Sequence, residues 1–517
     1  MLSSLSAHLP VLQVVVLLIA APLCALFGNR HLAWTIAFIA ASAAFVISTL
    51  LLGSVLDGSV ISYHLGGWAP PWGIEYRIDA ANAFILFIVS LIGVLVLPYA
   101  RQSIEREFEE STHSYFYTCY LLCLTGLLGV AATGDAFNVF VFLEISSLAT
   151  YALVAFGAKR DKRALTAAYN YLIMGTIGAT FFVIGIGFLY MVTGTLNMAD
   201  LAVRLAEVGD TRVTRVAFVF ILVGMGLKLA MFPLHLWLPN AYSYAPSAIT
   251  AFLAATATKV ALYVLLRFTF TVFQFDFPVQ ELTFEYVVMP LAVVAMFAAS
   301  IAAVFQQDVK RLLAYSSVAQ VGYMLLGVAL LTEAGLTAGI IHLFNHAVTK
   351  GALFLAVGCF VYQVGSSRLG DLKGIGKTMP WTTAALTAGG LSLIGVPLTV
   401  GFISKWYLIQ ASLETGSLLI AGLIVASSLI AVIYVWRIVE VAYLEPAPEG
   451  REAKEAPLSM LLPTYALVVA SLYFGINSEL TSSAASQAAN ALYSATDFAA
   501  PPMLLSPADL PSEGASQ

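Results

Sequence analysis

Two lysines lie inside stretches of this sequence that are long and apolar enough to cross a lipid bilayer. Lys228 is part of VAFVFILVGMGLKLAMFPLHLWLP, and Lys259 is part of SAITAFLAATATKVALYVLLRF. A charged side chain at mid-depth in a membrane costs about 2.5–3.5 kcal/mol on insertion scales, so such residues indicate a functional site. Pro233 follows Lys228 closely and removes a helical hydrogen bond, which predicts a broken helix beside the charge.

Other ionisable residues in apolar stretches extend this pattern. Glu144 lies within FLEISSLATYALVAFG, where a carboxylate stays ionised only beside an opposite charge. Lys405 follows Pro397 in LSLIGVPLTVGFISKWYLI, which repeats the combination of a proline and a buried lysine. The segment IIHLFNHAVTKGALFLAVG carries a polar stripe at helical spacing, formed by His342, Asn345, His346, Thr349 and Lys350. A polar stripe on an apolar helix indicates a polar or hydrated interior.

These protonatable groups favour proton transfer over the binding of an organic solute. In chain order they are Glu144, Lys228, Lys259, His342, His346, Lys350 and Lys405. His235 is spaced from Lys228 so that both would share one helical face, and Tyr263 shares a face with Lys259. Gln320 allows two interpretations, a member of the relay or a partner in a hydrogen bond between helices.

No cofactor or metal site is predicted for this chain. His342 and His346 have a spacing that fits zinc, but no further ligand accompanies them. Cys24, Cys119 and Cys123 lie in apolar stretches without a partner motif, as does Cys359, so we interpret all four as packing residues. The sequence also lacks dinucleotide-binding, P-loop and iron–sulfur motifs.

Composition places these residues in an all-α, multi-pass membrane protein. The 517 residues are 60% hydrophobic and 10% charged, with a mean hydropathy of +0.89. Apolar runs of membrane-spanning length predict about fourteen spans. Their ranges are 10–28, 32–52, 80–100, 115–133, 136–157, 165–192, 215–238, 246–270, 286–305, 311–331, 336–363, 381–413, 417–443 and 458–477. Pro233 and Pro397 predict that two of them are discontinuous helices.

The basic residues predict the orientation of the chain. They concentrate in alternate loops, which contain Arg30, Arg101, Arg106, Lys159, Arg160, Lys162, Arg163, Lys310, Arg311, Arg368, Lys373, Lys377, Arg451 and Lys454. The positive-inside rule then places these loops in the cytoplasm and both termini outside, which is the arrangement expected in a bacterial inner membrane. Arg267 and Arg437 lie near span ends, where snorkelling is expected.

The composition of three segments outside the spans predicts their local structure. The Gly-, Trp- and Pro-rich loop 53–79 predicts ordered turns on the outer side. The segment 368–378 is short and amphipathic, which is typical of an interfacial connector. The tail 479–517 is rich in Ala, Ser and Pro, and we expect it to be poorly ordered.

Four motifs carry a resemblance to a known family. They are FLEISSLATYALVAFG, GLKLAMFPLHLWLPNAYSYAPSAITAFLAATATKVALYVLLRF, RLLAYSSVAQVGYMLLG and HLFNHAVTKGALFLAVG. Together they resemble the proton-translocating antiporter-like subunits of Mrp-type sodium/proton antiporters, respiratory complex I and membrane-bound hydrogenases. The resemblance covers about 80–480 and is strongest to the D-type subunits of the Mrp antiporters. NAYSYAP and Gln320 depart from the complex I pattern, and the chain ends without the long lateral helix of the largest complex I member.

The resemblance implies a fold with two inverted five-helix repeats. The implied divisions are 1–114 for three N-terminal spans, 115–270 for the first repeat, 286–443 for the second, 444–478 for a charged loop and the last span, and 479–517 for the tail. It also implies matched site residues, which are Glu144, Lys228, Lys259, His342, His346 and Lys405.

The expected function is proton conduction within a complex of several membrane subunits that exchanges sodium for protons. In this hypothesis Glu144 keeps Lys228 protonated, and loosening of the pair sends the proton through Lys259 and the histidines to Lys405. The first alternative is a proton-pumping subunit of a complex I-like oxidoreductase or a membrane-bound hydrogenase, in which other chains perform the redox chemistry. A solute symporter of another inverted-repeat fold and a purely structural membrane subunit are further alternatives.

Overall fold

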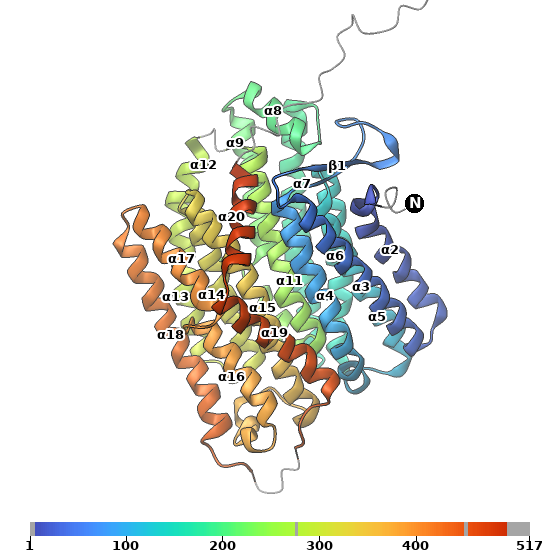
Figure 1. Cartoon of the computed structure of the whole chain (residues 1–517), viewed down its shortest axis with the longest axis vertical. Coiled ribbons are helices and arrows are strands. Elements are labelled where there is room, and N and C mark those ends of the chain that lie inside the picture. Colours follow the sequence, from blue (N-terminus) through green and yellow to red (C-terminus); the bar gives the residue numbers. More distant parts are fainter. Residues whose placement is uncertain (1–5, 275–277, 449–452, 494–517) are drawn as a thin grey trace, which may run out of the picture.

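The computed structural model describes residues 6–274, 278–448 and 453–493, and these are almost entirely helical (Figure 1). The helices of the N-terminal half are α2 (Leu9–Phe27), α3 (Arg30–Val55), α4 (Ala80–Glu107), α5 (His113–Ala132), α6 (Ala136–Ala155), α7 (Arg163–Thr193), α8 (Met198–Val208), α9 (Arg212–Leu229), α10 (Trp237–Tyr244) and α11 (Ser247–Leu266). Those that follow are α12 (Pro278–Thr283), α13 (Met289–Val304), α14 (Val309–Ala329), α15 (Glu333–Val364), α16 (Pro380–Ile394), α17 (Val400–Glu414), α18 (Leu418–Tyr443), α19 (Leu458–Ile476) and α20 (Glu479–Tyr493).

Within the described residues, twelve helical segments are long and apolar enough to cross a membrane. Two further crossings are interrupted, one between α9 and α10 and one between α16 and α17. The interrupted crossings coincide with the two spans expected to be discontinuous, so the fourteen spans and the all-α membrane fold predicted from the sequence are confirmed.

Both interruptions occur where the sequence places a proline. α9 ends at Leu229, Ala230 adopts a left-handed conformation, and Pro233 lies in the non-helical stretch before α10. α16 ends at Ile394, and Pro397 lies in the turn before α17. The end of α19 packs against this second break, because a Cβ added to Gly475 would lie 2.4 Å from the carbonyl oxygen of Leu398.

The loop between α3 and α4 is ordered, as expected, but it forms strands that were not predicted. β1 (Ile61–His64) and β2 (Glu75–Ile78) pair antiparallel, with Ile61 opposite Ile78. The side chains of Tyr76 and Ile78 are buried, so the hairpin packs onto the helices through one strand.

The first part of the C-terminal tail is helical, which differs from the expectation for 479–517. Residues 479–493 form the helix α20, which packs against α15 and α4, whereas 494–517 lie outside the described residues (Figure 1). The prediction of poor order was therefore wrong for 479–493. Alanines at helical spacing form most of the buried face, namely Ala484, Ala485, Ala488 and Ala489, and Leu492 extends it. Alanine has the highest helix propensity and lets helices approach closely, so this composition favours a packed helix.

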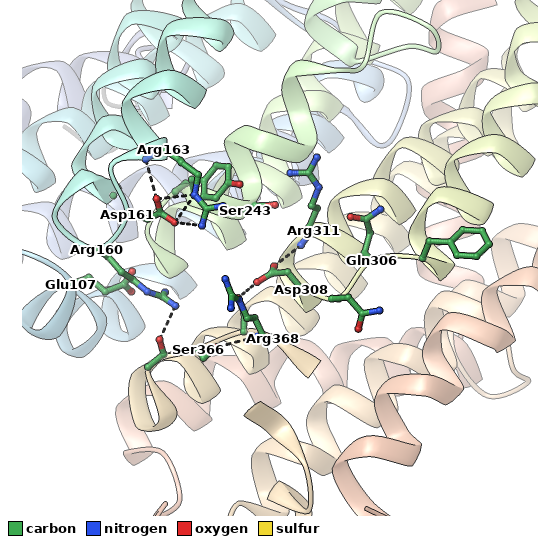
Figure 2. A pocket seen from close by; sticks show the side chains of 17 residues that line it. Glu107, Arg160, Asp161, Arg163, Ser243, Gln306, Asp308, Arg311, Ser366 and Arg368 are labelled. Atoms are coloured by element: carbon green, nitrogen blue, oxygen red, sulfur yellow. Dashed lines mark hydrogen bonds and ion pairs between the residues drawn. The ribbon is translucent and has the colours of Figure 1, made fainter. Parts of the chain in front are cut away.

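The loops between the crossings are also ordered at the end of the bundle that carries the basic residues. The connector 368–378 forms two short helical turns, and it buries Leu369, Leu372 and Ile375 beside α18. Next to this connector, a cavity is enclosed by loops from both halves of the chain (Figure 2).

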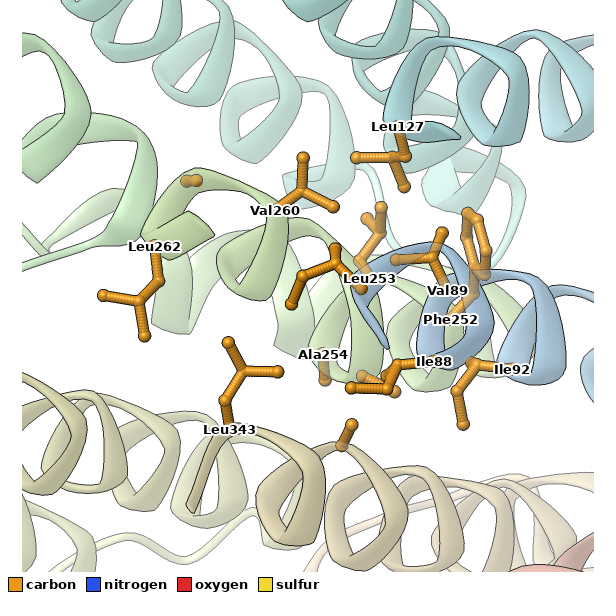
Figure 3. Close-up of a cluster of buried hydrophobic side chains, with 14 of the residues drawn as sticks. Ile88, Val89, Ile92, Leu127, Phe252, Leu253, Ala254, Val260, Leu262 and Leu343 are labelled. Atoms are coloured by element: carbon orange, nitrogen blue, oxygen red, sulfur yellow. The ribbon is translucent and has the colours of Figure 1, made fainter. Parts of the chain in front are cut away.

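The apolar core is centred on α11, in which every residue except Ala257 is buried. Around it, side chains of α4, α5 and α15 interdigitate with Phe252, Leu253 and Val260 (Figure 3). A helix that is buried on all sides is typical of the centre of a membrane bundle. Lys259 therefore lies on a helix that the rest of the bundle covers on all sides.

A substitution that introduces a charge on the buried face of α20 tests whether this helix stabilises the fold. Ala485→Glu should lower the free energy of unfolding by about 2 kcal/mol or more, because it buries a carboxylate without a partner. Ser483→Glu on the exposed face is the matched control and should leave the thermal midpoint in detergent unchanged. Equal midpoints for the two variants would contradict a packed α20.

Candidate functional site

The structure brings Glu144 and Lys228 together. Lys228 lies in the last turn of α9, with its Nζ 3.4 Å from Oε1 of Glu144 on α6. The same ammonium donates a hydrogen bond of 2.7 Å to Oγ of Ser147, one turn further along α6. The Lys228 side chain is 7% exposed and that of Glu144 is 26% exposed, so the pair is enclosed on one side only. A cation at the end of α9 also complements the helix dipole.

His235 does not share a helical face with Lys228, and that expectation was wrong. The helix ends at Leu229, so His235 lies in the non-helical stretch, where its ring stacks on Phe232 with centroids 5.1 Å apart. His235 is buried, and its Nδ1 has no hydrogen-bond partner. Trp237 donates its indole N–H to the carbonyl of Leu227 at 3.0 Å, which satisfies one of the carbonyls freed at the end of α9.

Lys259 is fully buried at the centre of the bundle. Its Nζ donates to the carbonyl oxygen of Ala254 within the same helix. Lys259 lies close enough to His342, His346 and Lys350 to interact with them electrostatically. Charge on Lys259 and charge on these neighbours therefore oppose each other.

The polar stripe of α15 faces α14, α16 and α17. His342 Nδ1 is 2.8 Å from Ser404 Oγ on α17, and Thr349 Oγ1 is 2.9 Å from Ser392 Oγ on α16. Lys350 donates to the Leu313 carbonyl at 2.8 Å and to Ser316 on α14. These contacts give the stripe polar neighbours in three helices.

His346 lies at the centre of the stripe, and Asn345 ties the stripe to the start of α17. Asn345 donates to the Val400 carbonyl at 2.5 Å. His346 is 3% exposed, and neither of its ring nitrogens has a hydrogen-bond partner. An imidazole in this state has one nitrogen free to accept a proton and one free to donate it.

Lys405 occupies the second helix break. Its Nζ donates to the carbonyls of Leu393 at 3.2 Å and Ile394 at 2.7 Å, which are freed because α16 ends there. The ammonium also lies 4.9 Å from the centre of the Tyr323 ring. Lys405 is thus held by backbone dipoles and an aromatic face, whereas Lys228 is held by a carboxylate. Gln320 is buried on α14.

An ion pair that was not predicted lies beyond Tyr263. Arg267 follows α11, is 3% exposed, and places Nη2 2.8 Å from Oδ1 of Asp79. Its Nε donates to the Tyr263 hydroxyl at 3.1 Å, and that hydroxyl is 3.4 Å from the carbonyl oxygen of Ala131. The expectation that Arg267 snorkels was therefore wrong, because a carboxylate from the start of α4 reaches it inside the protein. The other snorkelling candidate, Arg437, donates to the carbonyls of Val304 and Gln306.

The model of the family described as NADH:quinone oxidoreductase/Mrp antiporter, TM, matches residues 133–431. The chain belongs to this family. The chain is 42% identical to the N-type subunit of the NADH-quinone oxidoreductase of Desulforudis audaxviator, over 92% of this chain and 97% of that protein. It is 33% identical to the D-type subunit of the Na(+)/H(+) antiporter of Alkalihalophilus pseudofirmus, over 91% of this chain and 94% of that protein.

Solved structures give the same family assignment. A chain of the Mrp complex from Dietzia sp. superposes with a TM-score of 0.87 at 28% identity, covering 96% of this chain and 100% of that one. A chain of the membrane-bound sulfane sulfur reductase, an archaeal respiratory membrane complex, has the same TM-score and identity. The resemblance drawn from the sequence motifs is confirmed, and the protein is a multi-pass membrane protein.

Substitutions in the buried pair of Arg267 and Asp79 should reduce stability much more than substitutions in an exposed ion pair. Either Arg267→Leu or Asp79→Leu leaves a buried charge without its partner, which should cost about 3–5 kcal/mol of stability. The double variant should cost clearly less than the sum of the two, as measured by thermal midpoints in detergent. The same cycle on the exposed pair of Arg215 and Asp210 should change the midpoints little. Additive effects at Arg267 and Asp79 would show that the two side chains do not depend on each other.

Proposed function

We propose that this chain is the proton-conducting subunit of a membrane complex that contains several subunits. The observation that supports it is the series of buried ionisable side chains that crosses the bundle. Its members come from two interrupted helices and two central ones, together with the partner of Lys228 on α6, namely Glu144, Lys228, Lys259, Lys350, His346, His342 and Lys405. Most buried polar groups in a membrane bundle only hold helices together, but basic groups that oppose each other's charge do not all carry protons at once, so a proton on one favours its loss from the next.

The first step depends on the Glu144–Lys228 pair. At about 4 Å, two opposite charges attract by about 4 kcal/mol in an effective dielectric near 20. A change of about 1.4 kcal/mol alters proton occupancy tenfold, so this pair decides whether Lys228 keeps its proton. When the pair separates, burial favours the neutral amine, and the proton leaves Lys228 for the centre of the bundle.

The centre of the bundle then passes the proton on. Lys259 has only a carbonyl as a hydrogen-bond partner, and its charge opposes charge on His346 and Lys350. A proton on Lys259 is therefore driven toward the stripe of α15, where His346 has both ring nitrogens free. His342 contacts Ser404, the residue that precedes Lys405. Lys405 completes the route and exchanges the proton at the other side.

The division into two inverted repeats, 115–270 and 286–443, forms part of this proposal. Asp135 caps α6 and Asp308 caps α14, each by accepting a hydrogen bond from the third residue of its helix. The backbone around Asp135 exchanges two hydrogen bonds with the segment after α7, and the backbone around Asp308 exchanges two with the segment after α15. The two bridges recur at corresponding places in the two segments, which supports a duplicated unit. The two helix breaks would then also correspond.

The type of complex is the second part of the proposal. We infer a sodium/proton antiporter of the Mrp type in a bacterial inner membrane, with other membrane subunits as partners. The relatives named as D-type subunits of Na(+)/H(+) antiporters and the chain of the Mrp complex support it. A proton-pumping subunit of a complex I-like oxidoreductase is the second candidate, because the relative at 42% identity is named as the N-type subunit of an NADH-quinone oxidoreductase.

Replacing Lys228 tests the conduction route. Lys228→Ala should reduce proton transport at least tenfold while the complex still assembles, because the Glu144 carboxylate loses the group that carries the proton. Transport is measured with a pH-sensitive dye in inside-out vesicles, and assembly by native gel electrophoresis. Lys162→Ala, on an exposed loop, is the control. Unchanged transport in the Lys228 variant would refute the proposed route.

Purification of the native complex decides between the two candidates. An Mrp-type antiporter should copurify with membrane chains only, and its transport should respond to sodium. A complex I-like enzyme should bring redox subunits with it, and quinone-dependent electron transfer should drive transport. Mass spectrometry of a tagged chain purified in mild detergent therefore assigns the complex.

A further inference from the structure

A cavity of about 530 Å³ opens at the end of the bundle where the basic loops gather (Figure 2). It is lined by the last residue of α4, by the loop between α6 and α7 with the first residue of α7, by α10, by residues around the start of α14, and by the segment after α15. Its charged lining consists of Glu107, Arg160, Asp161, Arg163, Asp308, Arg311 and Arg368. Both proposed repeats contribute to it, and the basic loops predict that it faces the cytoplasm.

The arginines of this cavity hold its rim together. Arg160 donates to the Gly365 carbonyl at 3.0 Å, and Arg311 donates to Asn240 at 2.9 Å. Arg163 pairs with Asp161 at 2.6 Å, and these hydrogen bonds lower the pKa of the Asp161 carboxyl. Because these three arginines have partners in the protein, the cavity does not resemble an open anion site. Its polar, fixed rim suits access by water and protons.

A buried lysine lies behind the wall of this cavity. Lys310, in the first turn of α14, is 1% exposed although the sequence interpretation counted it as a loop residue. Its Nζ donates to the carbonyl of Ala245 at 3.0 Å, and Ala245 lines the cavity. The lysine also interacts electrostatically with Glu107, Arg160 and Asp308, which line the same cavity. Lys310 therefore contacts the wall of the cavity directly, through Ala245.

Glu107 supplies the acid at this wall. Its carboxylate accepts hydrogen bonds from Ser103 Oγ at 2.6 Å and from the backbone N–H of Ser247 at 3.2 Å. Ser247 is the first residue of α11, so Glu107 caps the helix that carries Lys259. The carboxylate is half-buried and lines the cavity, which leaves it accessible to water, and it interacts electrostatically with Lys310.

From Lys310 a line of polar groups continues inward along α14. One turn on, the Leu313 carbonyl accepts a hydrogen bond from Lys350, and Ser316 accepts a second one. Lys350 in turn interacts electrostatically with Lys259. The cavity, Lys310, Lys350 and Lys259 thus follow one another from the basic end of the bundle to its centre.

We propose that this cavity and Lys310 form the cytoplasmic proton-uptake route of the chain. The inference rests on the proposed function. A proton from water in the cavity binds the Glu107 carboxylate, and the neutral Lys310 amine then takes it to become an ammonium. The Lys310 N–H bond breaks when the neutral Lys350 amine receives the proton by way of the Ser316 hydroxyl. No electrons move: Glu107 returns to a carboxylate, Lys310 returns to a neutral amine, and Lys350 becomes the ammonium whose proton continues toward Lys259.

Two substitutions of Lys310 distinguish a role in proton transfer from a purely structural role of its charge. Lys310→Met removes the charge, whereas Lys310→Arg keeps a charge that donates to carbonyls but does not give up its proton. A relay predicts that both variants assemble and transport protons at least tenfold more slowly in inside-out vesicles. Transport at the original rate in the Arg variant would overturn the proposal, because a structural role is preserved by arginine. Lys454→Met, exposed and outside the cavity, is the control.

Blocking the cavity provides a second measurement that does not alter Lys310. In a chain whose four cysteines are replaced by alanine, Ser366→Cys places a thiol in the cavity lining (Figure 2). A bulky, membrane-impermeant thiol reagent should inhibit transport in inside-out vesicles and have no effect in right-side-out ones. Lys454→Cys should be labelled from the same side without inhibition. Labelling of Ser366→Cys with full transport would overturn the uptake route.

Measuring the Lys228→Ala variant in the same vesicles distinguishes failure of the uptake route from failure of the proposed proton conduction. If Lys228→Ala stops transport while the Lys310 variants and the blocked cavity do not, conduction stands and the uptake route is wrong. If Lys228→Ala transports normally, the proposed function itself fails.

Discussion

The cost of burying a charged amine is the constraint on which this structure depends. Each buried lysine needs oxygen acceptors inside an apolar bundle, and the chain provides them in different ways. Lys228 has the carboxylate of Glu144 and a serine hydroxyl, Lys405 has the carbonyls at a broken helix end, and Lys259 has one carbonyl of its own helix. The acceptors differ in strength, so the lysines differ in how firmly they hold a proton.

The two helix breaks add a second requirement of the same kind, because they free backbone carbonyls inside the bundle. A helix that ends inside a bilayer exposes carbonyls that water does not reach, and each must find another donor. After α9 the indole of Trp237 supplies one donor, and after α16 the ammonium of Lys405 supplies two hydrogen bonds. At the second break, the group that satisfies the backbone is therefore the group proposed to carry the proton. In the proposed route, loss of the proton from Lys405 would therefore also weaken the hydrogen bonds to these two carbonyls.

The parts of this architecture that depend on local sequence were predictable, and the parts that depend on distant partners were not. Runs of apolar residues indicated the spans, and Pro233 and Pro397 marked the breaks. The pair of Arg267 and Asp79 joins residues 188 positions apart, so no local pattern indicates that this arginine turns inward. Lys310 resembled a loop residue because it starts a helix, and only the packing of α10 over it shows its burial. α20 was missed because alanine and serine indicate disorder or a close-packed helix equally well, and the neighbouring surface decides.

The lysines at the two broken helices have different acceptors: Lys228 has a carboxylate, and Lys405 has two backbone carbonyls. In the proposed route, energy is therefore needed at Lys228, where an ion pair must be separated. A carboxylate stabilises an ammonium by its full charge, whereas carbonyls do so by dipoles, so Glu144 is a stronger acceptor than the carbonyls of the second break. Proton transfer away from Lys228 therefore requires the Glu144 pair to be weakened first. Glu144 is the more exposed partner, and Val141 and Leu148 are exposed on the same face of α6. In the proposed relay, a partner subunit packed on this face would change the solvation of Glu144 and thereby the strength of its pair with Lys228.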